Sequence, residues 1–400
     1  MDKLRVVFSS TVFEEVETGP GIYAQYLWDA FRDDPDIEFH VVAPFFKQAH
    51  PRLHPAAEAT SGSIYHRVAH VCRQIIGDQA GRTTLHGNAA HAMGEFTRYP
   101  GPWLAQVNDY EAAEVYCRPF AIMRQHGPRR ILSMVWRHHQ EARVVRSATR
   151  IVSNSDFTRS RILDIYHADP QRVVTIHKAV DTSVFQRPSS LPADPFPDRP
   201  AGARLVFVGA DWQRKGLAEL VSALGIVAKS FPNVNLVVGG PSDHASLGEI
   251  ARLAAAAGAG EHLLLAGRLS REKLIATYFH SDIFVLPSHC EALGVAILEA
   301  MAAGLAVISC PVGGIPEIIR SPAEGVLVPP QDSPALAGAI MSLLRNADER
   351  ARLAQAGPQR AADFSKSLMV ARIKDLYLDL AHAAGPARPG LPAACHRSPQ

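Results

Sequence analysis

The chain alternates short runs of Val, Ile and Leu with longer stretches in which apolar residues recur at helical spacing. Short apolar runs of this kind are typical of strands buried on both faces, as in parallel sheets covered by helices. The pattern is cleanest in the second half, where the strand-like runs are residues 205–209, 235–239, 263–267, 282–288, 306–310 and 325–329. We therefore expect an α/β fold with parallel sheets.

The first half repeats this alternation less regularly, with strand-like runs at residues 4–10, 38–44, 103–109, 150–155 and 173–178. A proline-rich segment separates the halves and cannot continue a helix or a central strand. We predict a first domain at 1–186, a linker at 187–202, a second domain at 203–365, a helix at 366–383 that packs back on the first domain, and a disordered tail at 384–400. Two Rossmann-like sheets would then face each other across a cleft, where parallel sheets bind ligands.

Composition excludes several classes of protein. Hydrophobic residues make up 47% of the chain and the formal net charge is +2, so bulk charge does not suggest a nucleic-acid partner. Five scattered cysteines without a C-x-x-C pair suggest neither a disulfide framework nor a zinc site, and a cytoplasmic compartment fits best. The apolar stretch 292–314 is interrupted by Glu299, Gly304 and Pro311, which predicts a helix followed by a strand rather than a membrane span.

Positive charge is concentrated between Arg118 and Arg161, where ten arginines face only Glu141 and Asp156. One interpretation is a solvated arginine-rich helix face. The other is a surface that meets anionic lipid headgroups or an acidic acceptor, which would place the protein peripherally on the inner face of the membrane.

The most informative motif lies at residues 287–301, where a buried strand ends, a loop follows and a helix begins near Gly294 or Val295. Glu291 falls in the loop and Glu299 lies a little over one turn inside the helix. The two carboxylates can therefore hold different parts of one elongated ligand, with the free N–H groups of the helix start between them. A nucleoside diphosphate sugar has this layout, because two diol-bearing groups flank a charged centre.

A second motif, residues 207–216, places Arg214 and Lys215 at the end of the second domain's first strand. Cations are mildly unfavourable at a helix N-terminus, so their position indicates an anionic partner. In a site without metal, such groups would neutralise a departing diphosphate. We therefore expect no metal and no cofactor. The alternative is a basic flank of a surface helix.

These motifs resemble those of the retaining glycosyltransferases of family 4, which have the two-domain GT-B architecture. Glu291 and Glu299 match the family's E-x7-E motif, residues 312–317 match its G-G-x-P-E element, and Gly209 with Arg214 and Lys215 matches the G-x(4)-R-K-G variant of its phosphate loop. The similarity covers most of residues 205–344. It is weaker in the first domain, where residues 152–155 and 180–185 look like the last strand and the exit from the domain.

The resemblance implies roles for individual residues. Glu291 would contact donor sugar hydroxyls and Glu299 the ribose. The donor would also meet Gly209, backbone groups of Leu293, Gly294 and Val295, the base-adjacent residues Arg268 and Leu269, and the first-domain loop with Gly19 and Gly21. This sequence departs from the family at Ala292-Leu293-Gly294, and at Asn108-Asp109-Tyr110, where the family often has a histidine. His177 is expected to be structural.

The sequence thus predicts a metal-independent retaining glycosyltransferase that moves a hexose-type sugar from a nucleoside diphosphate sugar to a carbohydrate or glycolipid hydroxyl. Family members commonly build surface polysaccharide, lipopolysaccharide or glycolipid. The catalytic candidates are Glu291, Arg214, Lys215 and, as a general base to be tested, Asp109. The alternatives are a nucleotide-sugar epimerase or phosphorylase of the same architecture and a non-catalytic nucleotide-sugar-binding protein. A nicotinamide dehydrogenase is disfavoured because no G-x-G-x-x-G follows the first strand.

Overall fold

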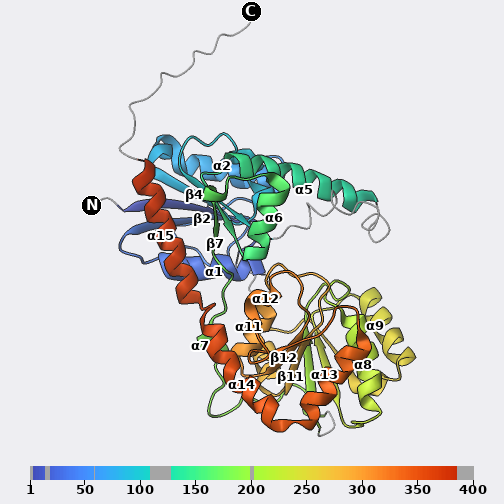
Figure 1. Cartoon of the computed structure of the whole chain (residues 1–400). Helices are drawn as coiled ribbons and strands as arrows, with labels where there is room; N and C mark the ends of the chain where they lie inside the picture. The colour runs from blue at the N-terminus through green and yellow to red at the C-terminus, as the bar shows by residue number, and fades with distance from the viewer. Residues whose placement is uncertain (1–2, 14–18, 58, 109–127, 199–201, 385–400) are drawn as a thin grey trace, which may run out of the picture.

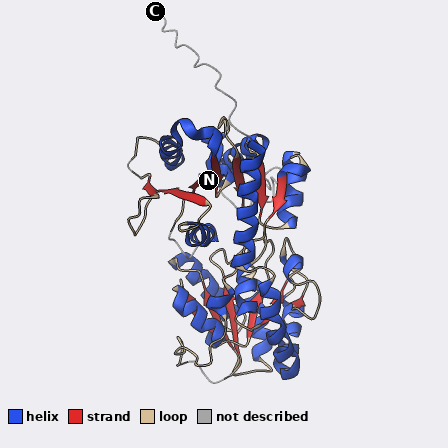
Figure 2. Cartoon of the chain, turned by 90° about the vertical axis from the view of Figure 1, so that its left-hand side faces the viewer, coloured by secondary structure: helices blue, strands red, loops and turns tan. Residues whose placement is uncertain are grey.

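The computed structural model describes residues 3–13, 19–57, 59–108, 128–198 and 202–384. Figures 1 and 2 show two lobes, each with a sheet between helices, and a C-terminal helix that runs from the second lobe along the first. Residues 385–400 of the tail predicted at 384–400, Asp109, and the part of the arginine-rich segment before residue 128 lie outside the described residues.

The first domain contains a parallel sheet in the order β3-β2-β1-β4-β5-β6-β7. Its strands are β1 (Leu4–Ser9), β2 (Ile37–Ala43), β3 (Leu53–Pro55), β4 (Thr83–Gly87), β5 (Trp103–Val107), β6 (Arg150–Ser153) and β7 (Val173–Thr175). The helices around it are α1 (Gly19–Phe31), α2 (Ile64–Ile76), α5 (Pro128–Ser147) and α6 (Asp156–Tyr166), with 3-10 turns η1 (Gly77–Arg82), η2 (Ala90–Phe96) and η3 (Pro170–Arg172). The five predicted runs all form strands, but β3 and β4 do not appear among the predictions.

The second domain contains a parallel sheet in the order β10-β9-β8-β11-β12-β13. Its strands are β8 (Arg204–Val208), β9 (Asn235–Gly239), β10 (Leu263–Gly267), β11 (Ile283–Leu286), β12 (Ala306–Ser309) and β13 (Val326–Leu327). Its helices are α8 (Leu217–Ala228), α9 (His244–Ala256), α10 (Arg271–Phe279), α11 (Val295–Ala302), α12 (Ile315–Ile318), α13 (Ser333–Arg345) and α14 (Ala347–Ala362), with a 3-10 turn η4 (Gly260–His262). All six predicted runs form strands.

Two features connect the domains. The short helix α7 (Thr182–Phe185) follows the first domain, and its Phe185 packs in the core of the second. The last helix, α15 (Lys366–Ala384), returns to the first domain and packs against α1, β1 and β4. Its buried apolar side chains join the core that contains Phe31 and Phe39, and its Lys374 binds Asp34 at 2.9 Å. The first domain's core is therefore completed by the end of the chain (Figure 1).

The predicted membrane-like stretch 292–314 folds as a helix and a strand, α11 and β12, as expected. Across the part of the chain that the structure describes, every helix is too short or too polar to cross a bilayer.

Candidate active site

The sheet order of the second domain brings the two charged motifs together. Strand β8 lies between β9 and β11, so consecutive connections leave in opposite directions at the boundary between β8 and β11. A parallel sheet binds ligands at such a switch point, beyond the carboxyl ends of its strands. The loop after β8 carries Arg214 and Lys215, and the loop after β11 carries Glu291, so both charged groups lie in this crevice.

Glu291 is the centre of the charged cluster. Its Oε1 lies 2.7 Å from Lys215 Nζ and 3.7 Å from Arg214 Nη1, and it accepts a hydrogen bond from Ser288 Oγ at 3.2 Å. The residue is only 7% exposed. Burial alone would raise the pKa of the Glu291 carboxyl, but the Lys215 and Arg214 cations and the Ser288 hydroxyl hold this pKa below its ordinary value. Glu291 is therefore an ionised carboxylate matched by two cations.

The two loops also hold each other through the backbone. Arg214 Nη1 donates to the carbonyl of Cys290 at 2.7 Å, and the His289 N–H donates to the carbonyl of Arg214 at 2.9 Å. A side chain at Gly209 would collide with the Lys215 stem, so the glycine lets this lysine cross the strand end toward Glu291. These contacts between the loops after β8 and β11 thus position both cations beside Glu291.

Glu299 lies inside α11 in a different environment. It is 9% exposed, and the Tyr278 hydroxyl donates to its Oε2 at 3.3 Å. Burial raises the pKa of Glu299 to about 7, although the charge of Arg271, the Tyr278 hydrogen bond and the charge of Lys215 favour the ionised form. The two carboxylates therefore differ, because the pKa of Glu291 is held below its ordinary value and that of Glu299 is raised above it.

Helix α11 begins at Val295, as the sequence predicts. Its N-cap, Gly294, has φ 98°, a left-handed conformation that favours glycine, and makes no side-chain cap. The first N–H groups of the helix thus have no capping side chain and could bind an anion. Leu293, the residue before this N-cap, is buried.

Arg268 and Leu269 follow β10 at the edge of the second sheet. Leu269 packs over the end of β9, where its Cδ1 lies 2.9 Å from the place that a Cβ would take on Gly239. Arg268 is exposed. Both residues lie two strands from β8, at the outer end of the crevice.

In the first domain, Gly19 and Gly21 open helix α1. Gly19 lies beside Lys178, whose Nζ is 3.5 Å from the place that a Cβ would take on this glycine. A narrow pocket there is lined by Gly19, Ile22, Tyr23, Tyr26, Lys178, Ala179, Val295 and Met369. Because Val295 starts α11, this pocket lies between the first-domain loop and the start of α11 in the second domain.

Lys178 is a candidate that the sequence analysis missed. Its signal is its position three residues after the end of β7, the last strand of the first domain, because parallel sheets place functional side chains beyond their strand ends.

A polar cluster marks the carboxyl ends of the first domain's strands. Asn88 donates to Ser10 Oγ and to the carbonyl of Pro20, both at 3.0 Å. Asn108 donates to the carbonyl of Asn88, and Asn154 donates to the carbonyl of Asn108 at 2.6 Å. The side-chain oxygens of Asn88 and Asn108 are buried without a partner among the described residues. The sequence analysis places Asn108 where the resembled family often has a histidine, and Asn88, which follows the unpredicted β4, lies at the centre of this polar cluster.

The arginine-rich segment is partly used inside the protein. Arg159 donates to the carbonyls of Val173 and Pro170, each at 3.2 Å, and Arg143 donates to Thr97 Oγ1 at 3.2 Å. On α5, Leu132 is 70% exposed and Trp136 is 43% exposed. These contacts explain several arginines structurally, while the membrane contact stays a prediction.

Two parallel-sheet domains, with a charged crevice at the switch point of the second sheet, are the architecture called GT-B, and comparison with known structures confirms the predicted fold. Sucrose-phosphate synthase from Thermosynechococcus elongatus superposes with a TM-score of 0.74 over 95% of this chain and 100% of that chain, at 20% identity. Anabaena HepE in complex with UDP-glucose gives a TM-score of 0.72 over 94% of this chain and 99% of that chain, at 15% identity.

Sequence comparison adds a family for the second domain. Residues 198–360 match the family described as Glycosyl transferases group 1. A D-inositol 3-phosphate glycosyltransferase from Thermobispora bispora is 31% identical over 247 residues, which are 60% of this chain and 58% of that relative. The match spans about half the length of other curated relatives with this name. The matched residues 198–360 contain both charged loops.

Proposed function

We propose that the protein is a metal-independent retaining glycosyltransferase that uses a nucleoside diphosphate sugar. The observation that carries this proposal is the buried Glu291 carboxylate held between Lys215 and Arg214 at the switch point of the second sheet. A carboxylate and two cations in one crevice match a ligand that offers hydroxyl donors at one end and a diphosphate beside them. The similarity of residues 198–360 to Glycosyl transferases group 1 supports the same activity.

The geometry suggests how the donor is held. The diphosphate binds Lys215 and Arg214 in place of Glu291, and the uncapped start of α11 provides a further anion site. Glu291 then accepts hydrogen bonds from the sugar hydroxyls, and Glu299 accepts hydrogen bonds from the ribose diol. As the bond between the sugar's anomeric carbon and phosphate breaks, the two cations stabilise the charge that develops on the leaving diphosphate.

The acceptor enters from the first domain, past the Asn88 cluster. Its hydroxyl oxygen bonds to the anomeric carbon on the face that the diphosphate leaves, and its proton passes to a leaving phosphate oxygen. The new bond therefore has the configuration of the old one. Asp109, outside the described residues, stays a candidate base.

Similarity to known proteins suggests which substrates to test first. HepE is known in complex with UDP-glucose, which makes UDP-sugars the first donors to test. The Thermobispora bispora relative is named for D-inositol 3-phosphate, so phosphorylated polyols stand beside carbohydrates and glycolipids as acceptors. Synthesis of surface polysaccharide, lipopolysaccharide or glycolipid at the inner face of the membrane is the broader setting we propose.

The test is a panel of UDP-, GDP- and ADP-sugars, scored by nucleotide release with and without acceptor. Glu291→Gln should lower transfer roughly 100- to 1,000-fold, because it removes the charge that faces the reacting sugar. Glu349→Gln, on the outer helix α14, is the matched control. Near-normal transfer by Glu291→Gln would refute the role of this carboxylate, donor binding without turnover would favour a binding protein, and acceptor-independent sugar conversion would favour an epimerase.

A further inference from the structure

The chain crosses between the domains twice, and the two crossings are bonded side by side. The Val180 N–H donates to the carbonyl of Phe364 and the Lys366 N–H donates to the carbonyl of Val180, each at 3.0 Å. This pairing is an isolated parallel bridge between Val180 and Ser365. The two chain segments that connect the domains are therefore paired with each other at this point.

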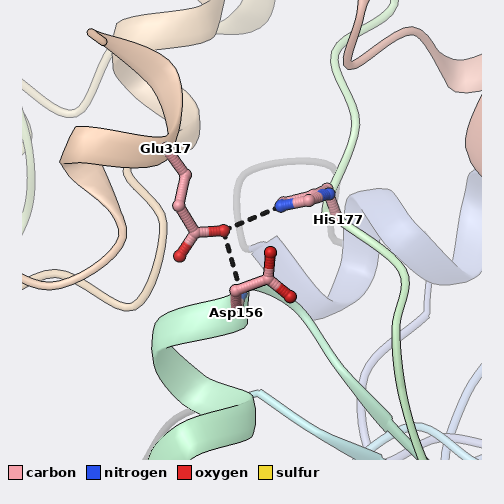
Figure 3. A group of neighbouring side chains, drawn as sticks. All are labelled: Asp156, His177 and Glu317. Carbon is pink, nitrogen blue, oxygen red and sulfur yellow. Dashed lines mark hydrogen bonds and ion pairs between the residues drawn. The ribbon is translucent and has the colours of Figure 1, made fainter.

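Close to this connection, Glu317 of α12 reaches from the second domain into the first (Figure 3). Its carboxylate oxygens accept hydrogen bonds from the backbone N–H groups of Asp156 and Phe157, each at 2.8 Å. One of them also lies 2.8 Å from His177 Nε2. Asp156 and Phe157 are the first two residues of α6, so the carboxylate binds free N–H groups at the positive end of an 11-residue helix.

The other end of α12 is bonded to the catalytic loop. The Gly314 N–H donates to the carbonyl of Glu291 at 3.1 Å, and a side chain on Gly313 would collide with that same carbonyl. Only two residues separate Gly314 from Glu317. The backbone of the proposed catalytic carboxylate is therefore joined to the first domain through one turn of helix.

The second domain holds Glu317 firmly. Arg360 donates to the backbone carbonyl of Glu317 and, at 2.9 Å, to that of Ile318. The Arg360 guanidinium lies over the ring of Phe364, which also packs against His177 with ring centroids 5.1 Å apart. Arg360 and Phe364 thus support the contact between Glu317 and α6, next to the two segments that cross between the domains.

We propose that Glu317 is a positioning residue whose carboxylate latches α6 and holds the two domains closed, so that the Glu291 loop faces the first domain's acceptor site. This role deepens the proposed glycosyl transfer and rests on it. Charge-assisted hydrogen bonds to a helix N-terminus are strong, and here they span the cleft rather than stabilise either domain alone. Opening the cleft would return both the carboxylate and the helix end to water.

The same cluster has the composition of a metal site, because ligand atoms of Asp156, His177 and Glu317 lie within 4.8 Å of one another. The carboxylate of Glu317 already accepts two backbone N–H groups, and Asp156 Oδ1 accepts from Thr175 Oγ1 at 2.6 Å. A metal would have to displace these bonds, so we assign the latch to the hydrogen bonds. An effect of equimolar Zn²⁺ or of a chelator on domain closure would overturn this assignment.

Two variant pairs of the full-length protein test the latch. Glu317→Ala removes the carboxylate, and Glu349→Ala, which breaks an ion pair within α14, is its control. Asp156→Pro deletes one latch N–H, and Asp156→Ala removes the same side chain while keeping that N–H. Proline is suited to the first helical position, and Ser155 before it is extended at φ −161° and ψ 161°, so α6 should tolerate the change.

We expect Glu317→Ala to increase the radius of gyration in small-angle scattering and to lower kcat roughly ten- to a hundredfold, with donor affinity within about twofold of wild type. Asp156→Pro should give a smaller change of the same kind, and Asp156→Ala should give none. Equal behaviour of the two Asp156 variants, an unchanged radius of gyration for Glu317→Ala, or a loss of donor affinity that matches its loss of kcat would overturn the proposal. The radius of gyration tests the latch even if the protein transfers no sugar from any donor. Absence of transfer would count against the proposed function and not against the latch.

Discussion

The two domains use the same kind of sheet but are completed differently. The second takes its strands and most of its covering helices from one segment, β8 to α14, and carries its charged site in two loops of that segment. The first needs α15 from the end of the chain, and its polar cluster joins strand ends as far apart as Ser10 and Asn154. A local sequence motif can therefore identify the second domain and its charged site, whereas the first domain depends on contacts between distant segments of the chain.

The strongest test of this difference between the domains is to remove α15 by ending the chain after Ser365. Five apolar side chains of α15 lie in the first domain's core: Met369, Ile373, Leu376, Tyr377 and Leu380. At about 1.5–3 kcal/mol each, their loss is on the order of 10 kcal/mol, comparable with the stability of a whole domain. We expect amide hydrogen exchange to show an unprotected first domain and a protected second domain.

A chain that ends after Ala384 is the control, since it keeps all of α15. If the chain that ends after Ser365 kept normal protection in β1 and β4, the first domain would be self-sufficient and the comparison wrong.

A second test acts on the charged site alone. Lys215→Met should weaken binding of a nucleoside diphosphate roughly 10- to 100-fold and lower transfer further, because one cation that neutralises the leaving group is lost. It should also raise the pKa of Glu291, since burial raises this pKa and the Lys215 charge opposes that effect. Calorimetric titration with UDP and the pH dependence of transfer measure the two effects.

The control for this variant is Lys229→Met, at the C-terminal end of α8 and away from the crevice. Unchanged affinity for every nucleoside diphosphate in Lys215→Met would show that the cation serves Glu291 and not a phosphate.

The comparison also explains what the sequence could predict. The second domain's strands carry polar side chains only at their ends (Arg204, Asn235 and Ser309), so each apolar run was located within a few residues. The motif around Glu291 and Glu299 contained its own strand, loop and helix start. In the first domain, β4 reads Thr-Thr-Leu-His-Gly and was missed, because its buried polar residues hide the apolar run. Asn88 follows this strand and is therefore absent from the predictions, which name Asn108 and Asp109.

The latch was invisible for a different reason. The G-G-x-P-E element was recognised, but the partners of Glu317 are backbone N–H groups 160 and 161 residues earlier in the chain. Backbone donors at a helix start carry no side-chain signal. His177 was interpreted as structural, and its contacts with Glu317 and Phe364 place it at the domain interface rather than in the donor crevice.

A third prediction concerns Glu299. Because its pKa is raised from 4.5 to about 7, the folded state binds its proton more tightly than the unfolded state. This contribution to stability is complete below about pH 4.5 and is lost as the pH rises toward 7, by roughly 3 kcal/mol at most. Urea unfolding at pH 5 and pH 8 should show this loss in wild type, and Glu299→Gln should lack that component. Parallel pH dependence in the two proteins would mean that Glu299 stays ionised throughout.

The smallest effect expected tests how α15 is attached. Tyr377 on α15 and His86 on β4 are both buried, with Tyr377 Oη 2.6 Å from His86 Nδ1, and His86 Nε2 has no partner among the described residues. Tyr377→Phe should therefore destabilise the first domain by about 1–3 kcal/mol, since it leaves a buried imidazole without a bond. Adding His86→Phe removes both polar groups and should recover much of this loss, because paired removal of buried polar partners can be nearly neutral. Chemical denaturation followed by hydrogen exchange in β4 separates this effect from the second domain, whose protection should not change. A double variant that is less stable than Tyr377→Phe alone would show that the imidazole contributes through packing with Phe8 and Tyr23 rather than through Tyr377.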